Sequence, residues 1–155
     1  MRGFTLLELL VTVVVVAILT TVAVPNFQRT IAVNRIVSDY NEILAGLTLA
    51  RSEAIKRRTK VTFELAETSP WAYQIKVAGV EEPIRQRSAR DGRVSVTTTL
   101  SGSSLTFGAL GTPANGSSCP SGCRITLTST YDGIDPRVLE VSSQGRVGRR
   151  DGDDS

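Results

Sequence analysis

The chain divides into three stretches that differ in how apolar and polar positions alternate. Residues 4–24 are almost continuously apolar. From residue 25 to about residue 58, apolar or small residues recur every three or four positions, which is the period of one face of an α-helix. From Val61 onward, apolar and polar residues alternate in short runs, which is the period of a β-strand. This order predicts one long helix followed by a β-rich region.

The second stretch continues the helix of the first. Its apolar positions are spaced alternately by four and three, so one face is expected to be buried; they are Ile36, Tyr40, Ile43, Leu47, Ala50 and Ala54. Pro25 lies between the two stretches, and a proline inside a helix removes a hydrogen bond and bends the rod. We therefore predict one bent helix from about Thr5 to Arg58, roughly 80 Å long at 1.5 Å per residue.

Six short alternating runs follow, broken by Gly, Pro, Ser and Asp. They predict antiparallel strands at Val61–Leu65, Tyr73–Val77, Val94–Leu100, Leu105–Phe107, Ile125–Leu127, and around Val138 and Val141. The predicted fold class is α+β, with the long N-terminal helix packed on antiparallel β-sheet. Gly108–Gly122 is rich in Gly, Ser, Pro and Ala, which favours a surface loop.

Composition narrows the possible functions. The chain has 155 residues, and about 125 of them lie beyond the continuously apolar stretch, enough for one modest domain. The net charge of +3 is too small by itself to imply a nucleic-acid partner. The absence of histidine excludes Ser-His-Asp and Cys-His catalysis. No catalytic motif is present, so we expect no enzyme, cofactor or metal, although an enzyme built on carboxylates or a lysine stays possible.

Glu8 is the one charged residue inside the apolar stretch. A charge at the centre of a bilayer costs about 3 kcal/mol, so such an acid usually marks function and has a partner. Cleavage between Gly3 and Phe4 would create an α-ammonium one helical turn from Glu8. That ammonium could pair with Glu8 of the same chain or of a neighbouring copy.

Two other readings of the N-terminal stretch are possible. It could be a secretory signal with Arg2 as its charged region and a cleavage site near Ala23. It could also be a plain transmembrane anchor, since the 21 residues from Phe4 to Val24 span about 31 Å. An early acid and Pro25 near the cut are unexpected in a secretory signal, and a plain anchor leaves Glu8 unexplained.

The run Gly3, Phe4-Thr5-Leu6-Leu7-Glu8, the apolar stretch and Pro25 together resemble the prepilin signal of type IV pilins and type II secretion pseudopilins. The stretch Ala50-Arg51-Ser52-Glu53-Ala54-Ile55-Lys56-Arg57 resembles the end of the long helix in the GspH/FimT group of minor pseudopilins. The resemblance implies cleavage after Gly3 by an inner-membrane prepilin peptidase, N-methylation of Phe4, and a role for Glu8 in the register of subunits.

The resemblance also implies a domain organisation and a location. Residues 1–3 would be the leader peptide, 4–24 the transmembrane and filament-core helix, 25–58 the amphipathic half of the helix, 59–150 a periplasmic β-rich head, and 151–155 an acidic tail. The protein would be a single-pass protein of the bacterial inner membrane that joins other pilins in a pilus or pseudopilus. It would be a structural or priming subunit of a type IV pilus, or alternatively a secretion pseudopilin that contacts exported proteins.

Cys119 and Cys123 are the only cysteines, separated by Pro120-Ser121-Gly122. These turn-forming residues can bring the two thiols together, and in an oxidising compartment we expect a disulfide. Free thiols and a metal site are the alternatives, although zinc would need two more ligands than the cysteines supply. So short a ring would stabilise the fold by about 2 kcal/mol.

Two groups of arginines are candidates for binding phosphate. Members of the FimT branch often end in Gly-Arg-x-Arg, a region implicated in holding DNA in uptake pili. Here Gly145-Arg146-Val147 matches, Gly148 stands at the second arginine position, and Arg149 and Arg150 follow. Three arginines on a glycine-loosened terminus could hold DNA without sequence preference, or the acidic tail could neutralise them. The second group is Arg85, Arg87, Arg90 and Arg93. Glu81, Glu82 and Asp91 offset most of its charge, which predicts an exposed, mixed-charge loop.

Overall fold

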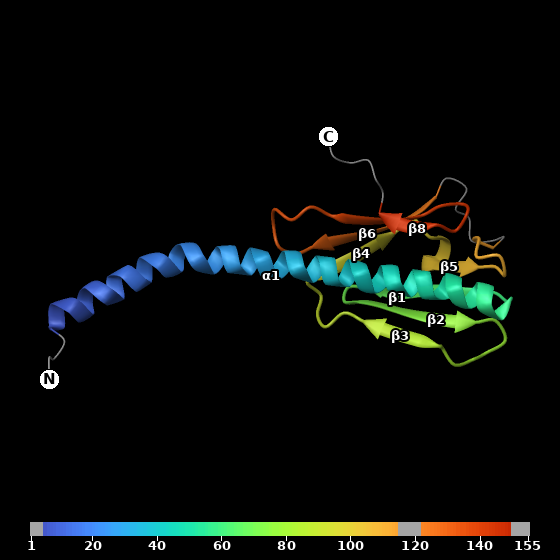
Figure 1. The fold of residues 1–155 in the computed structure, drawn as a ribbon, viewed down its shortest axis with the longest axis horizontal. Coiled ribbons are helices and arrows are strands. Elements are labelled where there is room, and N and C mark those ends of the chain that lie inside the picture. The colour runs from blue at the N-terminus through green and yellow to red at the C-terminus, as the bar shows by residue number, and fades with distance from the viewer. Residues whose placement is uncertain (1–4, 115–121, 150–155) are drawn as a thin grey trace.

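A single helix, α1 (Leu6–Arg57), runs along most of the molecule (Figure 1). The computed structural model of the protein describes residues 5–114 and 122–149. The 52 residues of α1 correspond to about 78 Å at 1.5 Å per residue. The helix continues through Pro25, and Figure 1 shows its first half curving away from the line of the second. The prediction of one long bent helix is confirmed.

The helix ends in a tight turn at Arg58. Arg58 has φ 52° and ψ 36°, the left-handed conformation. Its N–H donates to the Ile55 carbonyl at 3.3 Å, and the Thr59 N–H donates to the Ala54 carbonyl at 3.3 Å. These two bonds form a Schellman motif, which satisfies carbonyls that the end of a helix would otherwise leave unpaired.

In the described part of the chain, eight strands form two antiparallel sheets of four. In the first sheet the spatial order is β3-β2-β1-β5, and its strands are β1 (Val61–Thr68), β2 (Trp71–Val77), β3 (Arg85–Ser88) and β5 (Ser104–Phe107). In the second sheet the order is β4-β6-β7-β8, and its strands are β4 (Val94–Thr98), β6 (Cys123–Ser129), β7 (Arg137–Val141) and β8 (Val147–Arg149). A short 3-10 turn, η1 (Ser101–Ser103), joins β4 to β5.

The second half of α1 lies along both sheets and closes the core. All six predicted stripe positions are buried. They pack against the inward residues of the strands, which include Phe63, Tyr73, Ile75, Phe107 and Leu127. Gly46 is required on this face, because a Cβ there would lie 2.7 Å from the Tyr73 ring. The helix therefore approaches β2 closely at this position.

The structure corrects the sequence predictions at three places in the sheets. β3 and β8 were not predicted, because each is a short edge strand with few apolar residues. Around the last predicted strand, Leu139 and Val141 are the buried pair and Val138 is only half-buried. Val138 and Val141 are three positions apart, so they cannot face the same side of a strand whose side chains alternate with a period of two.

Candidate assembly and binding surfaces

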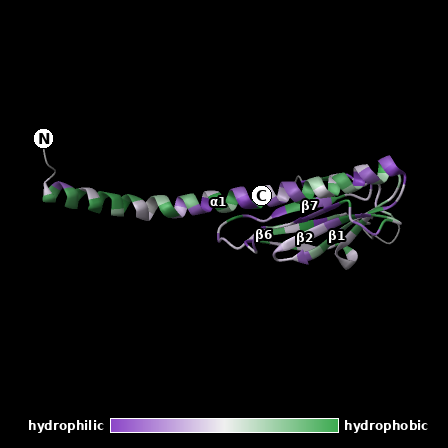
Figure 2. Cartoon of the chain, turned by 90° about the horizontal axis from the view of Figure 1, so that it is seen from below, coloured by the Kyte–Doolittle hydropathy of each residue, from purple (hydrophilic) through white to green (hydrophobic). Residues whose placement is uncertain are grey.

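The first half of α1 is an exposed apolar surface, and it is the candidate assembly surface of the protein. Figure 2 shows this half as hydrophobic along its length and projecting beyond the sheets. The exposed fraction of its large apolar side chains ranges from 83% at Leu6 to 48% at Val15. A helix that is apolar on every side needs lipid or other protein around it. The helix is long and apolar enough to cross a membrane.

Three threonine hydroxyls inside this apolar segment are satisfied within the helix. The hydroxyls of Thr12, Thr20 and Thr21 donate to the carbonyls of Leu9, Ala17 and Ile18 at 2.7 to 2.8 Å. Such internal bonds are what a hydrocarbon environment requires of a polar side chain.

Glu8 lies in the first turn of α1, and Thr5 caps the helix. The Thr5 Oγ1 accepts a hydrogen bond from the Glu8 N–H at 3.2 Å. Thr5 and Glu8 have the Thr-x-x-Glu spacing of a capping box, a signal that the sequence analysis missed. A carboxylate in the first turn also interacts favourably with the helix dipole. Gly3 and Phe4, the predicted cleavage site, lie outside the described residues.

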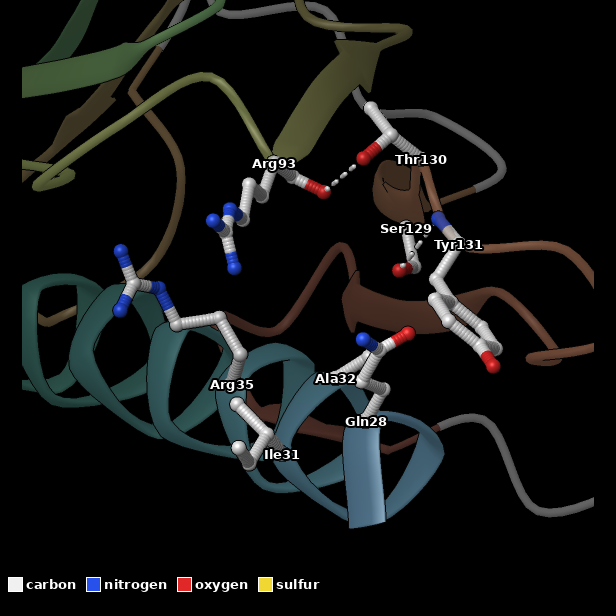
Figure 3. A pocket seen from close by; sticks show the side chains of 8 residues that line it. All are labelled: Gln28, Ile31, Ala32, Arg35, Arg93, Ser129, Thr130 and Tyr131. Atoms are coloured by element: carbon white, nitrogen blue, oxygen red, sulfur yellow. Dashed lines mark hydrogen bonds between the residues drawn. The ribbon is translucent and has the colours of Figure 1, made fainter. Parts of the chain in front are cut away.

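The β6–β7 loop contacts the helix where the projecting half meets the head. The Tyr131 hydroxyl donates to the Pro25 carbonyl at 3.5 Å, and Arg29 donates to the Gly133 carbonyl at 3.4 Å. A cavity of about 360 Å³ lies beside these contacts. Figure 3 shows Gln28 and Tyr131 at one end of it, and Arg35 and Arg93 at the other. The head is therefore attached to α1 from Pro25 onward.

Glu42 connects the helix to the first sheet. It accepts a hydrogen bond from Tyr73 at 2.9 Å and pairs with Arg85 at 3.1 Å and with Arg87 at 3.4 Å. Burial alone would raise the pKa of Glu42, but the hydrogen bonds from Tyr73 and Arg85 and the charges of both arginines outweigh it and lower the pKa. Burial, followed by the bond to Glu42, raises the pKa of Tyr73 to about 12.

Asp39 is a second polar link between the helix and the first sheet. It is 8% exposed and accepts a hydrogen bond from the Trp71 indole N–H at 3.1 Å. Burial raises the pKa of Asp39, although the Trp71 bond and the charge of Arg35 oppose the shift. Arg35 itself pairs with Asp91 at 2.8 Å.

These contacts revise the predicted basic loop. Arg85 and Arg87 belong to strand β3 and pair with Glu42 of the helix. Arg90 and Arg93 lie in an exposed connection, as predicted, and Arg93 is 3.8 Å from Asp91. The acid that neutralises Arg85 and Arg87 is therefore Glu42, which is distant in sequence, and neither Glu81 nor Glu82 pairs with them within the described residues.

Arg146 and Arg149 are not on a loose terminus. Ser142 donates its N–H to the Arg146 carbonyl at 2.9 Å and accepts the Arg146 N–H on its hydroxyl at 3.1 Å. Arg149 is the last residue of β8, opposite Leu139 of β7. Both arginines are exposed, and in the described part of the chain neither forms an ion pair. Arg150 and the acidic tail lie outside that part.

Cys123 is the first residue of β6 and is 2% exposed. Cys119 lies outside the described residues, so the Cys119–Cys123 bridge stays a prediction. Across residues 5–114 and 122–149, no group of three or more His, Cys, Asp or Glu side chains is placed to hold a metal ion.

A long helix with an exposed apolar half and a head of two antiparallel sheets is the architecture of the pilin class. Residues 39–145, more than half of the chain, match the family of the type II transport protein GspH, and residues 1–24 match the prokaryotic N-terminal methylation motif. The chain therefore belongs to the GspH family of minor pilins and pseudopilins. Its members are structural subunits that assemble with other pilins, and the motif and the apolar helix indicate membrane anchoring.

Solved structures of one minor pilin share the fold. The type IV minor pilin FimU of Pseudomonas aeruginosa PAO1 matches in two crystal forms. The first has a TM-score of 0.64 and 24% identity and covers 76% of this chain and 90% of FimU. The second has a TM-score of 0.59 and 26% identity and covers 74% and 91%. No curated protein matches the chain.

Proposed function

We propose that the protein is a minor subunit of a type IV pilus, made as a precursor and inserted in the inner membrane with its head in the periplasm. Prepilin peptidase removes residues 1–3 and the new N-terminal Phe4 is methylated. The observation that carries this proposal is the exposed apolar half of α1, which is long enough to cross a bilayer and bears a single acid, Glu8. The likeness to a type IV minor pilin favours a pilus over a secretion machine.

Glu8 has a defined role in this proposal. The α-ammonium of Phe4 becomes its partner when a subunit enters the filament, and this pairing sets the register between neighbours. Before assembly the carboxylate costs free energy in the bilayer, so assembly is favoured because it supplies the partner. The Thr5 cap remains in the mature chain and holds the first turn in helical form.

The test combines mass analysis with filament incorporation. The mature chain should begin at N-methylated Phe4, and replacing Glu8→Val should leave membrane insertion intact while incorporation into filaments falls. Thr12→Val, which removes another polar group from the same segment, is the matched control and should incorporate normally. A mature terminus near Val24, or incorporation of the Glu8 variant at the parent level, would refute the proposal.

The rival within the family is a pseudopilin of a type II secretion system that contacts exported proteins. Deleting the gene separates the two functions. Loss of pili with normal secretion supports the pilus subunit, and loss of secretion with normal pili supports the pseudopilin.

DNA binding during natural transformation is the second candidate function. The observation that favours it is that Arg146 and Arg149 are both exposed and, within the described residues, free of ion pairs. Exposed arginines without an acidic partner can contact phosphates without reading bases. The full-length chain in detergent should then bind duplex DNA weakly, without sequence preference and less at higher salt.

A further inference from the structure

The fold gathers three distant segments at the end of the head that lies furthest from the N-terminus: the end of α1, the loop after β5, and the β7–β8 turn (Figure 1). Arg51 of α1 donates to the Gly111 carbonyl at 3.1 Å. A Cβ on Gly111 would lie 2.6 Å from Ile55, and a Cβ on Gly145 would overlap the Gly111 carbonyl oxygen. The loop is thus packed between the end of α1 and the turn that carries Arg146.

This end of the molecule is strongly basic, and Figure 2 shows the end of α1 as hydrophilic. We call its five exposed cations the distal basic face: Lys56, Arg57, Arg58, Lys60 and Arg146. Lys56 and Arg57 share Glu53, at 3.5 and 2.6 Å. Arg58, Lys60 and Arg146 form no ion pair with any described residue. Three positive charges therefore remain available to a ligand.

A purely structural reason explains only part of this cluster. Cations in the last turn of a helix interact favourably with its dipole, which accounts for Lys56 and Arg57. Arg58 occupies the left-handed position after the helix, where glycine is the usual residue. An arginine there has an unfavourable backbone conformation that glycine would avoid. Arg58 therefore adds a positive charge to this face at a conformational cost.

Arg149 is poorly placed to act with Arg146. It lies three residues further along β8, which separates the two Cα atoms by about 10 Å. β8 runs away from the β7–β8 turn, so Arg149 is further from the end of α1 than Arg146 is.

We propose that the distal basic face binds the phosphate backbone of duplex DNA, with Arg146 acting together with Arg58 and Lys60 instead of with Arg149. This inference rests on the DNA-binding part of the proposed function and assigns its residues. The three unpaired cations come from two hydrogen-bonded segments, the connection from α1 to β1 and the β7–β8 turn. They offer bidentate guanidinium contacts and one ammonium contact to phosphates, which carry no sequence information.

The test measures binding of a labelled random-sequence duplex by fluorescence anisotropy, using the full-length chain in detergent at several salt concentrations. With about three phosphate contacts, log affinity should fall against log salt with a slope of about −2.7. The double variant Arg58→Gly with Lys60→Gln should bring the slope to about −0.9, because one contact remains. The single variant Arg146→Gln should reduce the magnitude of the parent slope by about 0.9.

The matched control is Arg90→Gln with Arg93→Gln, which removes the same charge from exposed positions in the connection before β4 and should keep the parent slope. Arg58→Gly alone should raise the urea midpoint while weakening DNA binding, so a loss of binding cannot be attributed to unfolding. A parent-like slope in the distal variant, or an equal loss in the control, would overturn the inference. If the parent binds no DNA at low salt, DNA binding and this inference both fail, while processing at Phe4 still tests the pilus proposal.

Discussion

Replacing Gly145→Ala should destabilise the head far more than Gly148→Ala, although both glycines lie in the run Gly145-Arg146-Val147-Gly148-Arg149. Gly145 has φ +77°, and an added Cβ would overlap the carbonyl oxygen of Gly111. Gly148 lies in β8 without a positive φ, and an added Cβ would meet nothing within 4 Å. Both substitutions add one methyl group to a glycine. The difference between their effects on the free energy of unfolding therefore reports the surroundings of each glycine.

The expected magnitude follows from three contributions. The left-handed conformation costs an alanine about 1–2 kcal/mol. Displacing the Gly111 carbonyl costs about 1–3 kcal/mol, as for other overpacked sites. Alanine also lowers the conformational entropy of the unfolded chain, which stabilises the folded state by about 0.4–1 kcal/mol. Gly145→Ala should therefore lower the free energy of unfolding by about 1–5 kcal/mol, whereas Gly148→Ala should raise it by up to about 1 kcal/mol through the entropic contribution alone.

The assay is urea denaturation followed by the fluorescence of Trp71. Trp71 is the only tryptophan of the chain and is 2% exposed on β2, so its emission reports unfolding of the head separately from the detergent-bound half of α1. Equal effects at the two glycines, or a parent-like midpoint for Gly145→Ala, would refute the close approach of the β7–β8 turn to the loop after β5.

Two further predictions concern groups in the head. Asp39→Asn keeps an acceptor for the Trp71 indole N–H. Burial raises the folded-state pKa of Asp39 above its ordinary 3.8, so the parent protein loses stability as the pH rises through the interval above 3.8. The variant has no carboxyl group at this position and does not lose that stability. The urea midpoint of the variant should therefore gain on the parent's from acid to neutral pH, and a constant difference would contradict the assigned pKa direction. Alkylation of the native protein without reductant should label neither Cys119 nor Cys123, and replacing both with serine should cost about 2 kcal/mol; full labelling would exclude the bridge.

Local periodicity was enough to predict the long helix, its buried stripe and six of the eight strands. The stripe from Ile36 to Ala54 repeats every three to four residues, and each predicted strand alternates over a few neighbouring positions. These patterns are local because a helix or a strand sets the direction of each side chain relative to its near neighbours. The prepilin-like N-terminus and the stretch Ala50–Arg57 also correctly indicated the family.

The remaining features depend on contacts between segments that are distant in the chain. β3 and β8 exist because β2 and β7 offer them an edge to pair with, and their own residues carry too little apolar alternation to predict a strand. Glu42 pairs with Arg85, 43 positions away, and Gly145 lies against Gly111. Arg146 therefore lies at the same end of the head as Arg58 and Lys60 instead of on a free terminus. These contacts form when the sheets pack on the helix. The residues that meet are far apart in sequence, so the local pattern of apolar and polar positions does not predict them.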